Sequence, residues 1–162
     1  MNFWLIKSEG SCYSIDDLKR DKKTAWTGIR NYQSRNFMMK DPTENSKISY
    51  GRSMRIGDLL LFYHSSSDLT GVYGIAKVSS KAHPDETALD KKDEHFDPKS
   101  TKENPIWYCV DISFVKKFSK PITLPEMKKD KKLSGIMVLK KGSRLSIQPV
   151  SENHFKHILS LR

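Results

Sequence analysis

The chain has 162 residues and a mass of 18.7 kDa, which is close to the size of one ordinary domain, so we expect a single domain over residues 1–162. Its 29 Lys and Arg against 19 Asp and Glu give a net charge of +10, which favours a polyanionic partner such as nucleic acid. No apolar run approaches the roughly 20 residues of a membrane span, and two cysteines are too few for a disulfide framework or a Cys-rich zinc site. Residues 1–8 lack the features of a signal peptide, so we expect a cytoplasmic protein, or a nuclear one in a eukaryote.

Two helix starts stand out in the first and last thirds of the chain. After a predicted strand at residues 2–8, Ser14 can cap a helix, with Asp17 at the reciprocal position of a capping box. Thr123 and Glu126 have the same spacing and predict a second helix with the same cap. These residues serve the fold, and we assign them no chemistry.

Strands dominate the middle of the chain. Residues 58–64 are almost continuously apolar, as expected of a strand covered on both faces, and residues 72–78 predict a further strand. Residues 107–115 alternate, which places Tyr108, Val110, Ile112 and Phe114 on one face. A short strand at 145–150 and a closing helix follow, the latter with core positions at Phe155, Ile158 and Leu159.

Two long polar stretches, residues 41–53 and 79–105, predict loops. The second contains three of the seven prolines, and a loop of that length in a small domain is usually functional or mobile. Short strands, few helices and long connections together favour an α+β fold, a curled mixed barrel with helices at its ends.

The segment from Trp26 to Asn36 has the composition of a base-reading surface. It contains two Arg, two Asn, one Gln and two large aromatic residues, and its apolar positions do not form one stripe. Rings can stack on a base, amides match its polar edge, and Arg binds phosphate or a base edge. The same composition also fits a capped helix whose Asn and Arg side chains tie loops together. Both interpretations stay open at this point.

Other residues could complete such a site. The candidate aromatic residues are Trp4, Tyr63, Trp107 and Tyr108, and the end of the 58–64 strand has a cluster of hydroxyl groups suited to a pocket wall. Lys140, Lys141, Arg144 and the 128–132 run could contact a phosphate backbone. Each aromatic residue could equally belong to the core, and each basic residue could simply be solvated.

Catalytic patterns are weak. His154 and His157 are one helical turn apart but have no evident third ligand, and the acidic residues and histidine at 93–97 lack ordered metal-ligand spacing. His64 and Ser65 are adjacent on a strand and therefore point to opposite faces. We therefore expect no metal, no cofactor and no catalysis. Two alternatives are a nucleic-acid-processing enzyme that uses the 93–97 carboxylates, and a protein-interaction module.

Five ordered blocks resemble one known family. They are K-S-E at 7–9, W-x-G-x-R-N-Y-Q-x-R-N at 26–36, G-D-L-x-L-F-Y-H-S at 57–65, P-x-W-Y-x-V-D at 105–111 and R-L-S-x-Q-P-V at 144–150. From about residue 2 to residue 159 the chain resembles an EVE domain, a branch of the PUA-like superfamily. Gly10 stands where a proline is usual, Thr27 stands where an acidic residue is usual, and 41–53 resembles a loop insertion.

The resemblance implies a PUA-like mixed β-pseudobarrel with flanking helices that reads a modified base, including modified cytosines, in DNA or RNA. Carried over by motif position, the base-binding pocket comprises Ser8, Trp26, Gly28, Arg30, Asn31, Gln33 and Asn36, with Tyr63, His64 and Ser65 as another wall and Trp107, Arg144, Ser146 and Gln148 nearby.

The resulting hypothesis is a monomeric, non-catalytic reader that extrudes a base from the nucleic acid. In it, Trp26 or Trp107 stacks on the base, and Asn31, Gln33 and Ser8 bind its polar edge. Phosphates are held by Arg30, Arg35, Lys140, Lys141 and Arg144. The choice between DNA and RNA, and the modification that is read, stay open.

Overall fold

The computed structural model describes residues 1–39 and 53–162, so the predicted insertion at 41–53 lies outside the described residues except for Ser53. Its strands are β1 (Phe3–Glu9), β2 (Lys23–Ala25), β3 (Leu59–Ser65), β4 (Gly71–Val78), β5 (His83–Pro84), β6 (Tyr108–Cys109), β7 (Asp111–Thr123) and β8 (Ile147–Val150). Its helices are α1 (Ile15–Asp21), α2 (Tyr32–Met39), α3 (Leu124–Lys129) and α4 (Glu152–Ser160), with short 3₁₀ turns η1 (Glu86–Ala88), η2 (Lys131–Leu133) and η3 (Met137–Leu139).

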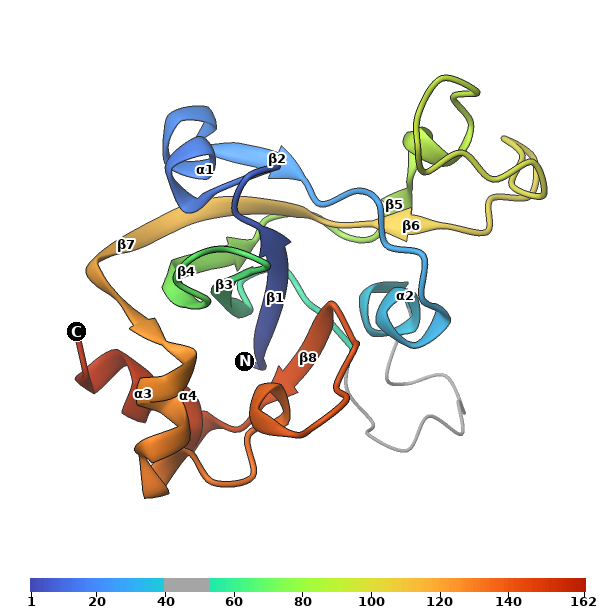
Figure 1. Ribbon diagram of the computed structural model, residues 1–162. Helices are drawn as coiled ribbons and strands as arrows, with labels where there is room; N and C mark the ends of the chain where they lie inside the picture. Colours follow the sequence, from blue (N-terminus) through green and yellow to red (C-terminus); the bar gives the residue numbers. More distant parts are fainter. Residues whose placement is uncertain (40–52) are drawn as a thin grey trace.

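Six strands form one mixed sheet in the order β2-β7-β4-β3-β1-β8, which curls into a half-barrel (Figure 1). The predicted fold class is confirmed. β1 and β3 are parallel, with Ser8 opposite His64, whereas the other pairs in this sheet are antiparallel. Because β1 and β3 run in the same direction, both strands end at the same edge of the sheet, where α1 begins.

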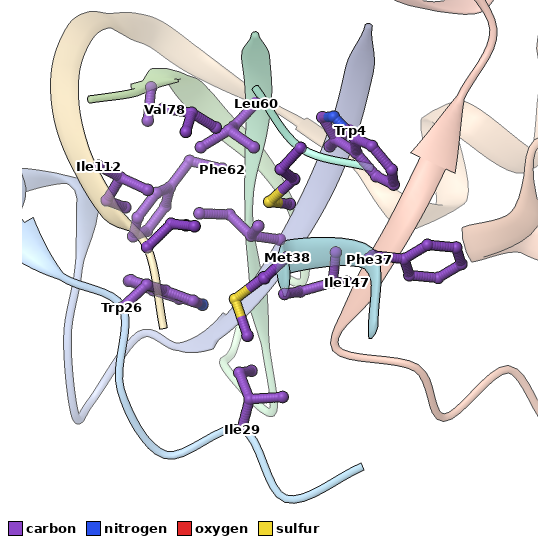
Figure 2. Packing of buried hydrophobic residues seen from close by; sticks show 14 of the residues in the cluster. Trp4, Trp26, Ile29, Phe37, Met38, Leu60, Phe62, Val78, Ile112 and Ile147 are labelled. Atoms are coloured by element: carbon purple, nitrogen blue, oxygen red, sulfur yellow. The ribbon is translucent and has the colours of Figure 1, made fainter. Parts of the chain in front are cut away.

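Two hydrophobic clusters pack on opposite faces of the central strands. The first contains Trp4, Trp26, Phe37 and Phe62 and lies between the sheet and α2 (Figure 2). The second lies on the other face, where α3 and α4 pack; Leu61, Phe155 and Ile158 belong to it. Since neighbouring strand residues point to opposite faces, the apolar run of β3 serves both clusters, as its sequence predicted.

The predicted helix caps are confirmed with one exception. Ser14 accepts a hydrogen bond from the N–H of Asp17, whose carboxylate accepts one from the N–H of Ser14, which completes the capping box. Thr123 caps α3 by accepting from the N–H of Glu126, but the carboxylate of Glu126 binds Arg162 at 2.8 Å. The second capping box was therefore wrong, because Thr123 is also the last residue of β7 and pairs there with Gly71.

The predicted strand at 107–115 is divided and extended. β6 ends at Cys109, and β7 runs on to Thr123, well past the predicted end. The second half of β7, with lysines at 116, 117 and 120, was not predicted as a strand, but pairing with β4 up to Gly71–Thr123 keeps it extended. The 79–105 stretch is mostly irregular, as predicted, and β5 attaches it to β6.

Candidate functional site

A pocket of about 480 Å³ lies where β1 ends, beside the segment that leaves β2 and below the 79–105 loop. This volume falls in the range of about 300–1,000 Å³ that is usual for small-ligand sites. The pocket is lined by Lys7, Ser8, Glu9, Cys12, Tyr13, Thr24, Ala25, Trp26, Thr27, Gly28, Ile29, Glu94, His95 and Ser146. Four of the predicted base-binding residues, Ser8, Trp26, Gly28 and Ser146, are therefore brought together.

Trp26 forms the aromatic part of the lining. Its indole packs edge-on against Phe62 at 5.5 Å and against Tyr13 at 6.1 Å, and the backbone N–H of Trp26 donates to the carbonyl of Val110 at 2.8 Å. Because Phe62 is fully buried in the core, these contacts fix the orientation of the indole. Burial and a hydrogen bond to Asp21 raise the pKa of Tyr13 to about 12, so this neighbouring ring stays uncharged at neutral pH.

Gly28 lets the 79–105 loop approach the pocket closely. Its φ of +83° lies in the left-handed region, and a Cβ added there would lie 2.9 Å from Nε2 of His95. The imidazole of His95 also lines the pocket, with Nδ1 3.0 Å from Oδ1 of Asp93. A glycine is thus favoured here both by the backbone conformation and by the ring above it.

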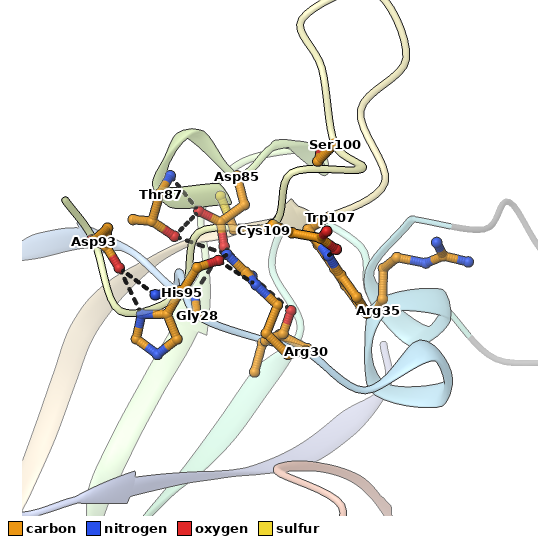
Figure 3. A network of polar contacts seen from close by, with 12 residues as sticks. Gly28, Arg30, Arg35, Asp85, Thr87, Asp93, His95, Ser100, Trp107 and Cys109 are labelled. Carbon is orange, nitrogen blue, oxygen red and sulfur yellow. Dashed lines mark hydrogen bonds and ion pairs between the residues drawn. The ribbon is translucent and has the colours of Figure 1, made fainter. Parts of the chain in front are cut away.

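Arg30 fastens this loop to the pocket wall (Figure 3). Its guanidinium donates to the carbonyls of Ile29 and His95, to Oγ1 of Thr87 and to Oδ2 of Asp85, at 2.7 to 3.1 Å. These are five hydrogen bonds, as many as a guanidinium can donate. Arg30 is therefore fully engaged within the chain, which differs from its predicted role of contacting a base or a phosphate.

Asp85 is the counter-ion of Arg30. Its side chain is completely buried and accepts from the N–H of Gly28 at 2.8 Å as well as from Arg30 and Thr87. Burial raises the pKa of Asp85, but the hydrogen bonds from Thr87, Arg30 and Gly28 outweigh it and hold the pKa below its usual value. The carboxylate is therefore ionised at neutral pH and orders both the glycine and the arginine.

The polar rim comes from β1 and from the segment before β8. The Ser8 hydroxyl donates to the carbonyl of Tyr13 at 2.5 Å, and the ammonium of Lys7 donates to the carbonyl of Ser143 at 2.9 Å. Burial lowers the pKa of Lys7. The carbonyl of Ser146 accepts from the backbone N–H of Lys7, which holds the strand end and the 143–146 segment together.

The predicted residues on α2 lie outside the pocket. Asn31 caps the helix by accepting from the N–H of Ser34 at 3.0 Å, Gln33 is exposed, and the amide oxygen of Asn36 accepts from Arg35. The amides of Asn31 and Asn36 form hydrogen bonds with neighbouring residues of the same helix, as in the capped-helix interpretation, and none of the three residues lines the pocket.

Trp107 stacks on Tyr32 at 4.9 Å, away from the pocket lining, and its indole N–H donates to Asp97 at 2.7 Å. Arg35 donates to the carbonyl of Ile106 and lies 4.7 Å from the ring centroid of Tyr32. Together these side chains dock α2 against the far end of the 79–105 loop (Figure 3). This arrangement again differs from the predicted base and phosphate contacts.

The other predicted wall at the end of β3 does not line the pocket either. Tyr63 is buried in the second cluster, and Nε2 of His64 accepts from the N–H of Ile15 at the start of α1 at 3.1 Å. Ser65 donates to the carbonyl of Ser8 at 3.4 Å. Gln148 is buried, and its Nε2 donates to Ser143 and to the carbonyl of Leu145. Ser65 and Gln148 thus support the rim through hydrogen bonds to Ser8 and to the 143–146 segment.

Lys140, Lys141 and Arg144 are exposed on the segment that leads to Ser146.

In residues 1–39 and 53–162, no group of three or more His, Cys, Asp or Glu side chains is arranged to hold a metal ion. His157 binds Asp130 at 2.6 Å, and His154 contacts the carbonyl of Ser134. Every helix in the same described ranges is too short or too polar to cross a membrane.

Sequence reasoning missed most of the pocket wall. His95 was considered only as a metal ligand in a charged loop, and Tyr13 was not among the candidate site residues. The sequence contained one indirect signal: a glycine in a dense polar segment marks a place where another chain segment approaches closely. It could not say which segment approaches, because Gly28 and His95 are far apart in the sequence.

Sequence comparison gives a consistent relationship. Human thymocyte nuclear protein 1 is 38% identical over an alignment that covers 98% of this chain and 72% of that protein. The chicken protein of the same name is 39% identical, with 98% and 67% covered.

Solved structures agree. A hypothetical protein from Leishmania major has a TM-score of 0.87 and 41% identity, covering 99% of this chain and 94% of that one. Human THYN1 protein in complex with 5-methylcytosine-containing DNA has a TM-score of 0.84 and 36% identity, covering 99% and 97%. The sequence model of the EVE domain matches residues 2–161. The chain therefore belongs to the EVE domain family.

Proposed function

We propose that this protein is a non-catalytic reader that binds one modified, cytosine-type base of a nucleic acid in the pocket between β1, Trp26 and His95. The observation that carries the proposal is the pocket itself, which combines a fixed indole with a polar rim in about 480 Å³. The human relative in complex with 5-methylcytosine-containing DNA supports the choice of ligand.

The pocket and the surrounding surface make different contributions to the free energy of binding. Extruding a base from a duplex costs a few kcal/mol, and stacking on an aromatic ring returns roughly 1–3 kcal/mol. Within the pocket, the free energy of stacking is therefore about equal to the cost of extrusion, so the net affinity has to come from phosphate contacts. The exposed Lys140, Lys141 and Arg144 near the rim are placed to supply them.

The roles of the predicted residues change accordingly. Trp26 is proposed to stack on the base, and Ser8, Ser146 and His95 to contact its polar edge. Arg30 positions the loop that carries His95, because its donors are already engaged. A methyl group on the base that fills an apolar gap adds about 0.8 kcal/mol, which corresponds to roughly fourfold tighter binding.

The test is the affinity of fluorescent single strands of DNA and RNA that contain one 5-methylcytosine or one cytosine at the same position. Thr27 lines the pocket and is exposed, so Thr27→Trp fills the pocket without touching the core. Thr101, which is also exposed and lies outside this pocket, provides the matched control Thr101→Trp.

We expect a preference of about fourfold for the methylated strand. It should be lost in Thr27→Trp and retained in Thr101→Trp. Equal binding of both strands by the wild type, or turnover of the oligonucleotide, would contradict the proposal. Binding of a protein partner without any retention of nucleic acid would favour the interaction module.

A further inference from the structure

A pocket that reads 5-methylcytosine has to solve a second problem. Thymine has the same methyl group at the same ring position, so methyl recognition cannot separate the two bases. They differ at the 4-position, where cytosine presents an amino donor and thymine a carbonyl acceptor. The pocket wall therefore needs a hydrogen-bond acceptor that faces the 4-position of the base. This requirement rests on the proposed function.

His95 is held in a fixed orientation from three sides. Its Nδ1 lies 3.0 Å from Oδ1 of Asp93, and the same oxygen accepts from the backbone N–H of His95 at 2.8 Å. Its carbonyl accepts two hydrogen bonds from Arg30, at 2.9 and 2.7 Å. Because an ionised carboxylate can only accept, this contact favours the tautomer with the proton on Nδ1, in which Nε2 is an acceptor.

Nε2 stands at the pocket wall. It lies over Gly28, where the missing side chain leaves room for it, and the His95 side chain is 38% exposed. The nearest carboxylate, that of Glu94, lies 3.9 Å from Nε2, beyond hydrogen-bond distance, and its side chain is 86% exposed.

Three neighbouring polar groups of the lining already donate their protons within the chain. The hydroxyl of Ser8 donates to the carbonyl of Tyr13, the hydroxyl of Tyr13 to Asp21, and the ammonium of Lys7 to the carbonyl of Ser143. The carboxylates of Glu9 and Glu94 also line the pocket, but both residues are exposed. Nε2 of His95 is an acceptor whose direction is fixed by the contacts of His95 with Asp93 and Arg30.

We infer that His95, oriented by Asp93, is a specificity-determining residue that accepts a hydrogen bond from the exocyclic amino group of the bound base. The pocket then selects amino-bearing, cytosine-type bases over thymine and uracil. Asp93 acts as a positioning residue, because it sets which nitrogen of His95 carries the proton.

The experiment compares single strands that differ at one position, which carries 5-methylcytosine, thymine or an abasic site. Single strands remove the cost of breaking a base pair from the comparison. We expect the wild type to bind the 5-methylcytosine strand about tenfold more tightly than the thymine strand, as one good hydrogen bond to a base edge allows.

The variants separate the hydrogen bond from the fold. Asp93→Ala and His95→Ala should each reduce the preference over thymine to about twofold or less, whereas Asp93→Asn, whose amide oxygen still accepts from Nδ1, should restore it. The matched control is His83→Ala, since His83 also binds a carboxylate, that of Asp111 at 2.8 Å, but does not line the pocket. It should keep the full preference.

Nitrogen NMR of the labelled imidazole provides a readout without nucleic acid. The wild type and Asp93→Asn should show the proton of His95 on Nδ1, and Asp93→Ala should show a mixture of tautomers. If both pyrimidine strands bind better than the abasic strand but equally well, the inference about His95 is overturned and the reader function stands. If neither binds better than the abasic strand, the proposed function itself fails.

Discussion

Replacing Gly28 with alanine tests the close approach between the pocket wall and the 79–105 loop. The residue has φ of +83°, and a Cβ there would lie 2.9 Å from Nε2 and 3.1 Å from Cε1 of His95. The left-handed conformation costs an alanine about 1–2 kcal/mol, and the stiffer unfolded chain offsets about 0.4–1 kcal/mol of this. The backbone effect is therefore a net loss of about 1 kcal/mol.

The contact with His95 adds a second effect. The imidazole is the end of a flexible side chain, so it will rotate away from the new methyl group and lose its hydrogen bond to Asp93, at a cost of roughly 1 kcal/mol. The total is about 2 kcal/mol, or a decrease in Tm of about 4–8 °C for a chain of this size. The rotated ring can no longer contact a base in the pocket.

Gly135 provides the matched control. Its φ of +85° is nearly the same as that of Gly28, but nothing lies within 4 Å of its Cβ position. Gly135→Ala should therefore lose only the backbone part, a decrease in Tm of about 2–4 °C, and keep its affinity for a 5-methylcytosine strand. Thermal unfolding and fluorescence anisotropy measure the two effects. Equal losses of stability in both variants, with unchanged binding, would refute the reasoning.

Replacing Lys140, Lys141 and Arg144 together by glutamine should reduce the slope of log affinity against log salt concentration by about 2 for a single strand. The preference for 5-methylcytosine should stay unchanged, and a lost preference would contradict the proposed division between surface and pocket. Arg30→Ala leaves the buried carboxylate of Asp85 without its cation and should lower the free energy of unfolding in urea by about 3 kcal/mol, and a loss below about 0.5 kcal/mol would show that the ion pair is unimportant. Because the pKa of Asp85 is lower in the folded protein than its ordinary 3.8, its contribution to stability is present above that value and is lost as the pH falls through the folded pKa. Asp85→Asn should therefore show a weaker dependence of Tm on pH in this acidic range, and parallel curves would contradict the assignment.

The sequence was sufficient for the framework of the fold. The apolar run of β3 and the alternation at 107–115 predicted strands, because burial on one face or two produces a pattern in neighbouring residues. The cap at Ser14 was also predictable from local sequence, because both partners of the capping box lie within four residues of each other. The continuation of β7 was not, because it depends on β4 as a partner rather than on its own charged residues.

The site was only half predictable. Trp26 and Gly28 were found from the composition of their segment, but that composition could not show where each side chain points. Arg30 has its acidic partner at Asp85, and His95 meets Gly28 only through the folded loop, so their roles are set by contacts over more than fifty residues. Local amide density marked a segment that contributes to the pocket, whereas the tertiary structure decided which of its residues line the pocket.

A crystal structure with a single strand that contains one 5-methylcytosine would test the central claim most directly. The account places that base against the indole of Trp26, with its amino group toward Nε2 of His95 and the neighbouring phosphates toward Arg144. A base seated elsewhere, for instance on the exposed ring of Tyr32, with the space between Trp26 and His95 left unfilled, would contradict it.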